Sequence, residues 1–118
     1  MKENIFLVKN KDVKNEEVKS IESSSVKGQF FIKPLKQTRN QLMIQVTMSS
    51  GIVVPEHIHD HESIIYIIEG AVESIIDGNS YIAKPGDVVY HPEGVPHSTH
   101  ALEKSIFIEI KSPPKKTW

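Results

Sequence analysis

Histidines are the residues of this chain whose spacing could do chemistry, because all six lie between residues 57 and 100. His57 and His59 follow the apolar run 52–54, and in an extended strand residues i and i+2 project from the same face. Two imidazoles placed in this way can share a metal ion, since bonds of about 2.0–2.1 Å need fixed side chains. A third ligand must come from another strand, and His97, after the proline-punctuated segment 85–96, is the candidate. We therefore expect a divalent transition metal, with zinc, nickel, iron and copper not distinguished.

The three remaining histidines are expected to lie outside the metal shell. His61 lies in the turn after the pair, where a solvated histidine, or one standing behind the ligands, is the common case. His91 precedes Pro92 in a strand-to-turn segment and is expected to be exposed. His100 follows His97 by three residues, so on a strand it faces the opposite way.

The stretch 105–111 alternates between two kinds of side chain. One face carries Ile106, Ile108 and Ile110, and the other carries Phe107, Glu109 and Lys111. Base rates favour the charged face in solvent, and the alternative places Glu109 and Lys111 in a polar cavity. In that alternative Glu109 is the candidate catalytic proton carrier, whereas Tyr66 and Lys111 are candidate substrate contacts.

Short β-rich stretches separated by turn residues form the chain from residue 28 onward. No long stretch keeps an apolar period of 3.6 residues, so helix is minor. Asp77 and Gly78 indicate a short hairpin, because tight hairpin turns need positive φ angles. The expected strands are 29–33, 41–48, 52–54, 64–69, 72–76, 80–83, 88–90, 97–99 and 104–111. Strands at this spacing are typical of a sandwich or barrel, so the predicted fold class is all-β.

Length and composition limit the architecture and the partners. The chain has 118 residues and a net charge of −1, which suits one domain and leaves no excess positive charge for nucleic acid or an anionic membrane. The absence of cysteine excludes disulfides, thiolate metal sites and cysteine nucleophiles. Residues 1–27 are expected to form an N-terminal arm or edge strand, and residues 28–118 one domain with its core at about 41–111.

The run 64–68 is the longest apolar run of the chain, and it bears on both location and assembly. It is too short to span a bilayer, so we expect a cytoplasmic protein with no membrane partner. The run is apolar on both faces of its predicted strand, so something must cover the outer face. A second protomer is the economical cover, and we expect a homodimer.

The order of glycines, histidines and prolines resembles the two linked motifs of the cupin superfamily. The first motif is Gly51, five residues, His57-x-His59 and later Gly70, and the second is Gly78, six residues, Pro85-Gly86-Asp87 and later His97. The resemblance covers about residues 41–111. It implies a small antiparallel jelly-roll barrel that holds a divalent metal in its mouth. Segments 57–62, 66–70, 85–88, 96–98 and 112–114 are similar to small single-domain cupins of pectin degradation, which open the ring of an unsaturated uronate sugar.

The chain departs from this pattern at informative positions. The family's Glu or Gln ligand falls on Ser63, whose neutral hydroxyl is a poor ligand, and Glu62 is one residue off and faces the opposite way unless a bulge re-aims it. The expected metal shell is then three histidines plus water. Where the pectin-degradation group has Asp, Phe and the Arg of a Ser-Pro-Pro-Arg tail, this chain has Glu109, Lys111 and Lys115. Arginine and lysine are not interchangeable where a carboxylate must be gripped bidentately.

Three functions are compatible with these residues. The first is an isomerase or lyase that acts on a small polar substrate, sugar-like or carboxylate, with the metal polarising a substrate oxygen. The second is a dioxygenase, because three-histidine iron sites resemble those of thiol and diketone dioxygenases. The third is a sensor or small-molecule binding module whose metal is structural or absent, since fold does not fix function.

Overall fold

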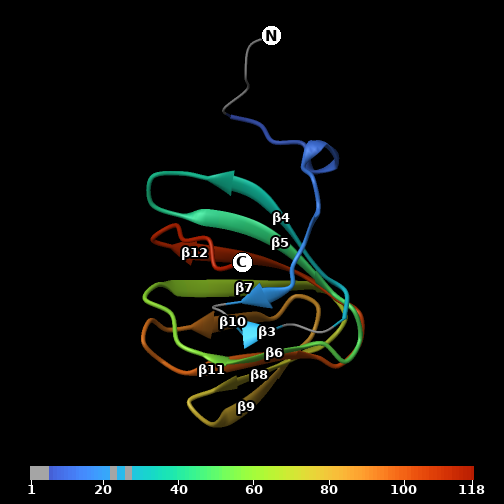
Figure 1. Ribbon diagram of the computed structural model, residues 1–118, viewed down its shortest axis with the longest axis vertical. Helices are drawn as coiled ribbons and strands as arrows, with labels where there is room; N and C mark the ends of the chain where they lie inside the picture. The colour runs from blue at the N-terminus through green and yellow to red at the C-terminus, as the bar shows by residue number, and fades with distance from the viewer. Residues whose placement is uncertain (1–5, 22–23, 26–27) are drawn as a thin grey trace.

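The computed structural model describes residues 6–21, 24–25 and 28–118, and the regular structure in those residues is almost entirely β-strand (Figure 1). The strands are β1 (Glu16–Glu17), β2 (Ser20–Ile21), β3 (Ser24–Ser25), β4 (Phe30–Gln37), β5 (Leu42–Met48), β6 (Val53–His57), β7 (Glu62–Glu69), β8 (Val72–Ile76), β9 (Asn79–Ala83), β10 (Val88–His91), β11 (His97–Ala101) and β12 (Ser105–Ser112), preceded by the 3-10 turn η1 (Asn10–Asp12). The prediction of an all-β fold is confirmed. No helix in the described part of the chain is long and apolar enough to cross a membrane.

Two antiparallel sheets face each other and enclose the core (Figure 1). The larger sheet has six strands in the order β1-β4-β5-β12-β7-β10, and the smaller has four in the order β6-β11-β8-β9. Neighbouring strands are often far apart in the sequence, as in a jelly roll, and every predicted stretch from 29–33 onward overlaps one observed strand. Two of the metal-ligand candidates lie at the end of β6 and just after it, and the third begins β11, so the smaller sheet positions them.

Part of the predicted N-terminal arm belongs to the larger sheet. β1 pairs antiparallel with β4 at the edge of that sheet, and β2 pairs with β3. Val18 and Ile21 are buried in the same core as the strands of the barrel. The arm residues 1–5, 22–23 and 26–27 lie outside the described residues.

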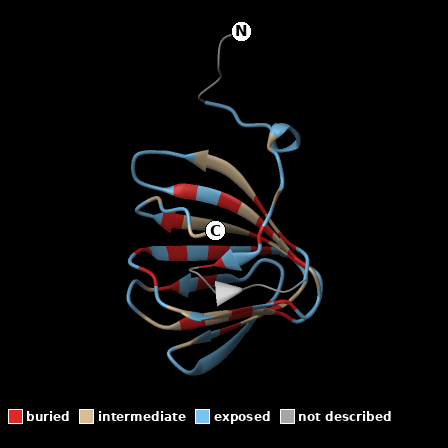
Figure 2. Cartoon of the chain, viewed as in Figure 1, coloured by how far each residue is buried: buried red, intermediate tan, exposed pale blue. Residues whose placement is uncertain are grey.

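Alternation along the strands builds the core, because successive side chains of a strand point to opposite faces. β5 shows the pattern most clearly, with Leu42, Ile44, Val46 and Met48 buried and the residues between them facing outward (Figure 2). Strands with one buried face and one exposed face are what two packed sheets require.

Two turns depend on residues that tolerate positive φ. Asp77 and Gly78 have φ angles of 50° and 81° and join β8 to β9, which confirms the predicted hairpin. Gly70 has a φ angle of 89°, and a Cβ atom there would collide with the carbonyl oxygen of Lys104 and with Ser105. Only glycine fits at this second turn, between β7 and β8.

β12 turns its charged face inward, so the base-rate expectation for this strand is wrong. Phe107 and Lys111 are buried, and Glu109 is partly buried. Residues directly opposite each other in antiparallel strands share a face, and Glu109 lies opposite Ile44 and Ile65, which are both buried. The physical reason is that the inner face of β12 borders a polar pocket, whereas its isoleucines lie on the outer face.

Candidate metal centre

The three predicted ligands come together at one end of the smaller sheet. His57 ends β6, His59 follows two residues later, and His97 begins β11 directly opposite His57 in the antiparallel pairing. One ring nitrogen from each residue lies within 4.8 Å of the corresponding atoms of the other two. The ring centroids are 4.3 Å apart for His57 and His59, 4.3 Å for His57 and His97, and 5.1 Å for His59 and His97.

Backbone carbonyls select the ring nitrogen that faces a metal. The Nδ1–H of His57 donates a hydrogen bond to the carbonyl oxygen of Pro55 at 2.7 Å, and that of His97 lies 3.4 Å from the carbonyl oxygen of Val95. A carbonyl oxygen only accepts, so each Nδ1 carries the proton and each Nε2 keeps its lone pair. Orientation of a ligating imidazole by its second nitrogen is the usual arrangement in metal sites.

Burial keeps the imidazoles of His59 and His97 uncharged, which is the form that binds metals. Desolvation, followed by the neighbouring His57, His61 and His97, lowers the pKa of His59 to about 2. Desolvation, followed by His91 and His57, lowers the pKa of His97 to about 3. Three converging imidazole nitrogens, those of His59 and His97 held neutral by burial, fit a divalent transition metal.

His91 was expected to be exposed, and the structure shows it buried, with 2% of its surface accessible. Its ring lies parallel to that of His97 at a centroid distance of 4.1 Å, and its Nε2 lies 3.4 Å from Ser74 Oγ. The cause is strand parity, because His91 is two residues from buried Val89 on β10. That parity was the signal in the sequence that could have placed this residue inside. Desolvation, with a smaller contribution from His57, lowers the pKa of His91 to about 4.

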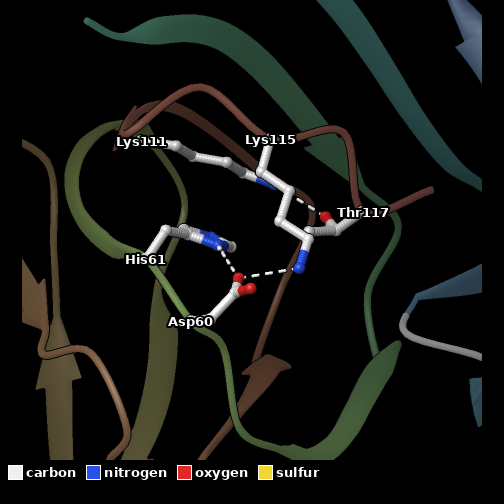
Figure 3. Close-up of polar contacts among 5 residues, drawn as sticks. All are labelled: Asp60, His61, Lys111, Lys115 and Thr117. Carbon is white, nitrogen blue, oxygen red and sulfur yellow. Dashed lines mark hydrogen bonds and ion pairs between the residues drawn. The ribbon is translucent and has the colours of Figure 1, made fainter.

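His61 is also buried, with 1% of its surface accessible, so it is not a solvated histidine. Its ring centroid lies 4.3 Å from that of His59. Its Nδ1 lies 3.7 Å from the Asp60 carboxylate (Figure 3). Neither ring nitrogen of His61 has a hydrogen-bond partner among the described residues. Desolvation, and then Lys111, lowers its pKa. His61 therefore lies behind the candidate ligand His59, which is the other position expected for it.

Ser63, at the position of the family's carboxylate ligand, points into the protein, whereas its neighbour Glu62 points to the outer face. Ser63 is buried, and its hydroxyl has no hydrogen-bond partner in the described part of the chain. Glu62 is exposed and accepts a hydrogen bond from the Tyr90 hydroxyl at 3.2 Å on the outer face. No bulge turns Glu62 inward, and it faces away from the histidines. His100 likewise lies off the site, 3.6 Å from Glu73.

The histidines open into a small cavity of about 40 Å³ between the two sheets. Glu109 and Lys111 line this cavity, so the inward face of β12 reaches the metal-ligand candidates. Tyr66 does not line it, because this residue lies on the outer face of β7 with 47% of its surface exposed. We therefore drop Tyr66 as a candidate contact for a substrate in this pocket.

The segment after β12 supplies Thr117, which sequence reasoning missed, and it places Lys115 beside the site. Lys111 Nζ donates a hydrogen bond to Thr117 Oγ1 at 2.6 Å, and Thr117 also lines the cavity (Figure 3). Lys115 Nζ lies 2.7 Å from Asp60 Oδ1 in the connection that carries His59. The sequence has no periodic pattern in this segment that indicates where it lies.

Comparison with known proteins identifies the family. A cupin-domain model matches residues 44–109, more than half of the chain, so the chain belongs to the cupin family. It is 32% identical over 74 residues to the pectin degradation protein KdgF of Dickeya dadantii, a match that covers 61% of this chain and 67% of that protein. It is 37% identical over 60 residues to the dimethylsulfoniopropionate lyase DddQ of Ruegeria pomeroyi, covering 50% of this chain and only 30% of the lyase.

Solved structures agree with this assignment. KdgF from a Halomonas species superimposes with a TM-score of 0.80 and 25% identity, covering 92% of this chain and 94% of that one. An RmlC-like cupin from Shewanella frigidimarina has a TM-score of 0.83 at 19% identity, covering 98% and 97% of the two chains, and supports the fold alone. The predicted resemblance to small cupins of the pectin-degradation group is confirmed.

Proposed function

We propose that this cupin is a metal-dependent lyase or isomerase that acts on a small substrate bearing a carboxylate. The observation that carries the proposal is the lining of one pocket by three converging imidazoles, a carboxylate and a buried ammonium group. The names of two relatives are compatible with it, since one is a lyase of dimethylsulfoniopropionate and the other a pectin degradation protein.

His57, His59 and His97 would hold a divalent transition metal, and zinc, nickel, iron and copper all suit imidazole donors. Such an ion, when bound, supplies a Lewis acid that polarises a substrate oxygen. Three protein ligands leave room for that oxygen, as in catalytic zinc sites. Ser63 at the family's carboxylate position keeps this room, because its short hydroxyl does not fill it.

Lys111 and Glu109 would act on the substrate from β12. Lys111 is 2% exposed, so its ammonium group forms strong charge-assisted hydrogen bonds with a carboxylate that enters the pocket. Glu109 lies two residues away on the same face, where its carboxylate can take a proton from the substrate and return it. Ile44 and Ile65, also in the lining, make part of the pocket wall apolar.

The test combines metal analysis with turnover. Elemental analysis of freshly purified protein identifies the metal, and His59→Ala should lose it. The loaded protein is then assayed with an unsaturated uronate and with dimethylsulfoniopropionate. Glu109→Gln should keep the metal and lose turnover, whereas the matched outer-face variant Glu62→Gln should keep both. Retained turnover in Glu109→Gln would refute the assigned role.

Two other outcomes would assign a different function. Oxygen uptake by the iron-loaded protein with thiols or flavonols, with no elimination or isomerisation product, would show a dioxygenase. Ligand binding that survives complete removal of the metal by a chelator, without turnover, would show a sensor or binding module.

We also propose a homodimer that covers the outer face of β7 and β10. About half of the surface of Ile64, Tyr66, Ile68, Val88 and Tyr90 is exposed there, which makes one contiguous apolar face. A second copy is the occupant we favour, because a two-fold interface pairs one patch with itself. Sedimentation should show a dimer in the wild type and a monomer in Ile68→Lys. A wild-type monomer at micromolar concentration would contradict the proposal.

A further inference from the structure

Residues 113–118, here called the strap, run from the end of β12 along the metal pocket to β1. Thr117 lines the cavity, and Lys115 pairs with Asp60 beside the histidines (Figure 3). Trp118 Nε1 donates a hydrogen bond to Glu16 Oε1 of β1 at 3.3 Å. The strap therefore joins the connection after β6, in the smaller sheet, to the edge strand of the larger sheet.

Trp118 fixes the far end of the strap. Its ring is partly buried against the hydrophobic core, and it lies 5.5 Å from Lys111 Nζ and 5.3 Å from Lys116 Nζ. Ammonium groups at these distances from an indole face are attracted to the ring. Trp118 is the only tryptophan of the chain, so its fluorescence reports on the strap alone.

The Thr117 hydroxyl accepts the hydrogen bond of the Lys111 ammonium group that the carboxylate of an acidic ligand would accept. The Lys111 ammonium group is almost fully buried, and the Thr117 hydroxyl accepts its hydrogen bond at 2.6 Å. A buried charge requires such a partner. A carboxylate is a stronger acceptor than a neutral hydroxyl, because the hydrogen bond is then assisted by charge on both sides. An acidic ligand therefore competes favourably with Thr117 for Lys111.

With the strap in place, the pocket is too small for most ligands. The cavity of about 40 Å³ has room for about three water molecules, far below the roughly 300–1,000 Å³ of typical ligand pockets. The pair between Lys115 and Asp60 is exposed, at 43% and 72% of the two side chains, and exposed ion pairs add little stability. The strap can therefore move while the two sheets stay intact.

We propose that the strap gates the pocket, and that an acidic ligand opens it by taking the Lys111 ammonium group from the Thr117 hydroxyl. The gating half concerns access to the pocket whatever reaction occurs there. The ligand half rests on the function proposed above for Lys111, so the two halves are tested separately.

The first experiment measures access to the pocket in the metal-free chain of residues 1–118 without a ligand. Lys115→Met and Asp60→Asn each remove the tether, and Lys104→Met is the matched control, since Lys104 is an exposed lysine away from the strap. Acrylamide quenching of Trp118 and the diethyl pyrocarbonate reaction of His57 and His59, followed by mass spectrometry, are the readouts. Both should rise at least about 3-fold in the tether variants and stay unchanged in the control.

His100 provides an internal reference, because it lies on the outer face and should react equally in all the variants. Circular dichroism establishes that each variant is folded. Tether variants that match the wild type in both readouts would overturn the gating half. Equal acceleration at His100 would do the same, because it would indicate general loosening of the fold.

The second experiment tests the ligand with glucuronate and its uncharged counterpart glucose. Glucuronate should increase the quenching of Trp118 fluorescence by acrylamide, and glucose should leave it unchanged. Thr117→Val, which removes the competing hydroxyl at constant shape, should lower the half-saturating glucuronate concentration at least about 3-fold, and Lys111→Met should abolish the response. Glucuronate that binds by calorimetry without changing Trp118, or that binds neither wild type nor Thr117→Val, would overturn the ligand half. Absence of turnover with every substrate would refute the proposed reaction and leave both fluorescence results standing.

Discussion

The imidazole ring of His91 lies parallel to that of the ligand candidate His97, with 4.1 Å between ring centroids and 6° between ring planes. This contact restricts the rotation of the His97 ring about its side-chain axis. The hydrogen bond of the His97 Nδ1–H to Val95 is long, at 3.4 Å, and restricts it less. His91 is itself placed by burial and by Ser74, so we assign it a positioning role for the metal site.

Replacement of His91 should weaken metal binding without removing a ligand. His91→Ala removes the ring that packs against one face of His97. Metal affinity should fall about 10-fold, the lower end of the roughly 10–100-fold loss seen when a residue that orients a ligand is replaced. His91→Phe keeps a flat ring in the stack and should recover most of the affinity. Competition with a chromophoric chelator measures both, with His100→Ala as the control on the outer face of β11. Equal affinity in His91→Ala and the wild type would contradict the role.

The strands and the convergence of the three candidate ligands could be predicted from the sequence, and most of these signals are local. Asp77 and Gly78 mark a turn by backbone preference, and the spacing of His57 and His59 puts two rings together within a few residues. His97 needed a tertiary inference, and the resemblance to cupins supplied it. The homodimer and the cytoplasmic location stay predictions.

The interior polar residues could not be predicted from base rates. Polar residues are mostly exposed in proteins, so Glu109, Lys111 and His91 were placed outside or left undecided. Their burial depends on which face of β10 and β12 looks toward the other sheet, and this is decided by partners such as Ile44 and Ile65, distant in sequence. Thr117 was missed because it reaches the pocket through a segment without periodic structure.

Acid should destabilise the metal-free protein. The folded-state pKa values of His59, His97 and His91 are about 2, 3 and 4, against the ordinary histidine value of 6.5 that applies to the unfolded chain. Below pH 6.5 the unfolded chain binds protons that the folded chain does not, so stability is full above that pH and falls as the pH drops toward 4. Each such histidine contributes a slope of up to about 1.4 kcal/mol per pH unit.

Urea denaturation of chelator-treated protein at pH 7 and pH 5 measures this slope. His91→Phe, which removes one of the buried imidazoles, should give a shallower slope than the wild type. His100→Ala should match the wild type, because that histidine is partly exposed. Equal stability of the wild-type protein at the two pH values would contradict the pKa directions.

Gly70→Ala should destabilise the fold more than Gly51→Ala. Both glycines have positive φ angles, 89° and 87°, so both substitutions carry a backbone cost of about 1–2 kcal/mol. A Cβ at Gly51 meets nothing within 4 Å, whereas one at Gly70 collides with the backbone of Lys104 and with Ser105. Ser105 is held by hydrogen bonds to the carbonyls of residues 71 and 103 and has little freedom to move. The extra loss, about 1–3 kcal/mol for overpacking, should appear in urea denaturation. Equal losses would show that the turn relaxes.

Lys111→Met should separate function from stability. Methionine has a similar length and no charge, and burying a charged group costs free energy that an apolar side chain does not incur. Lys111 is 2% exposed, so the free energy of unfolding should stay within about 1 kcal/mol of the wild type or increase, while the glucuronate response is lost. Lys104→Met, at an exposed site, should change neither quantity. If Lys111→Met lost several kcal/mol, the ammonium group would be a structural element of the core, and its burial would no longer indicate an anion anchor. A stable variant without glucuronate binding would show instead that the chain keeps a buried charge for its ligand.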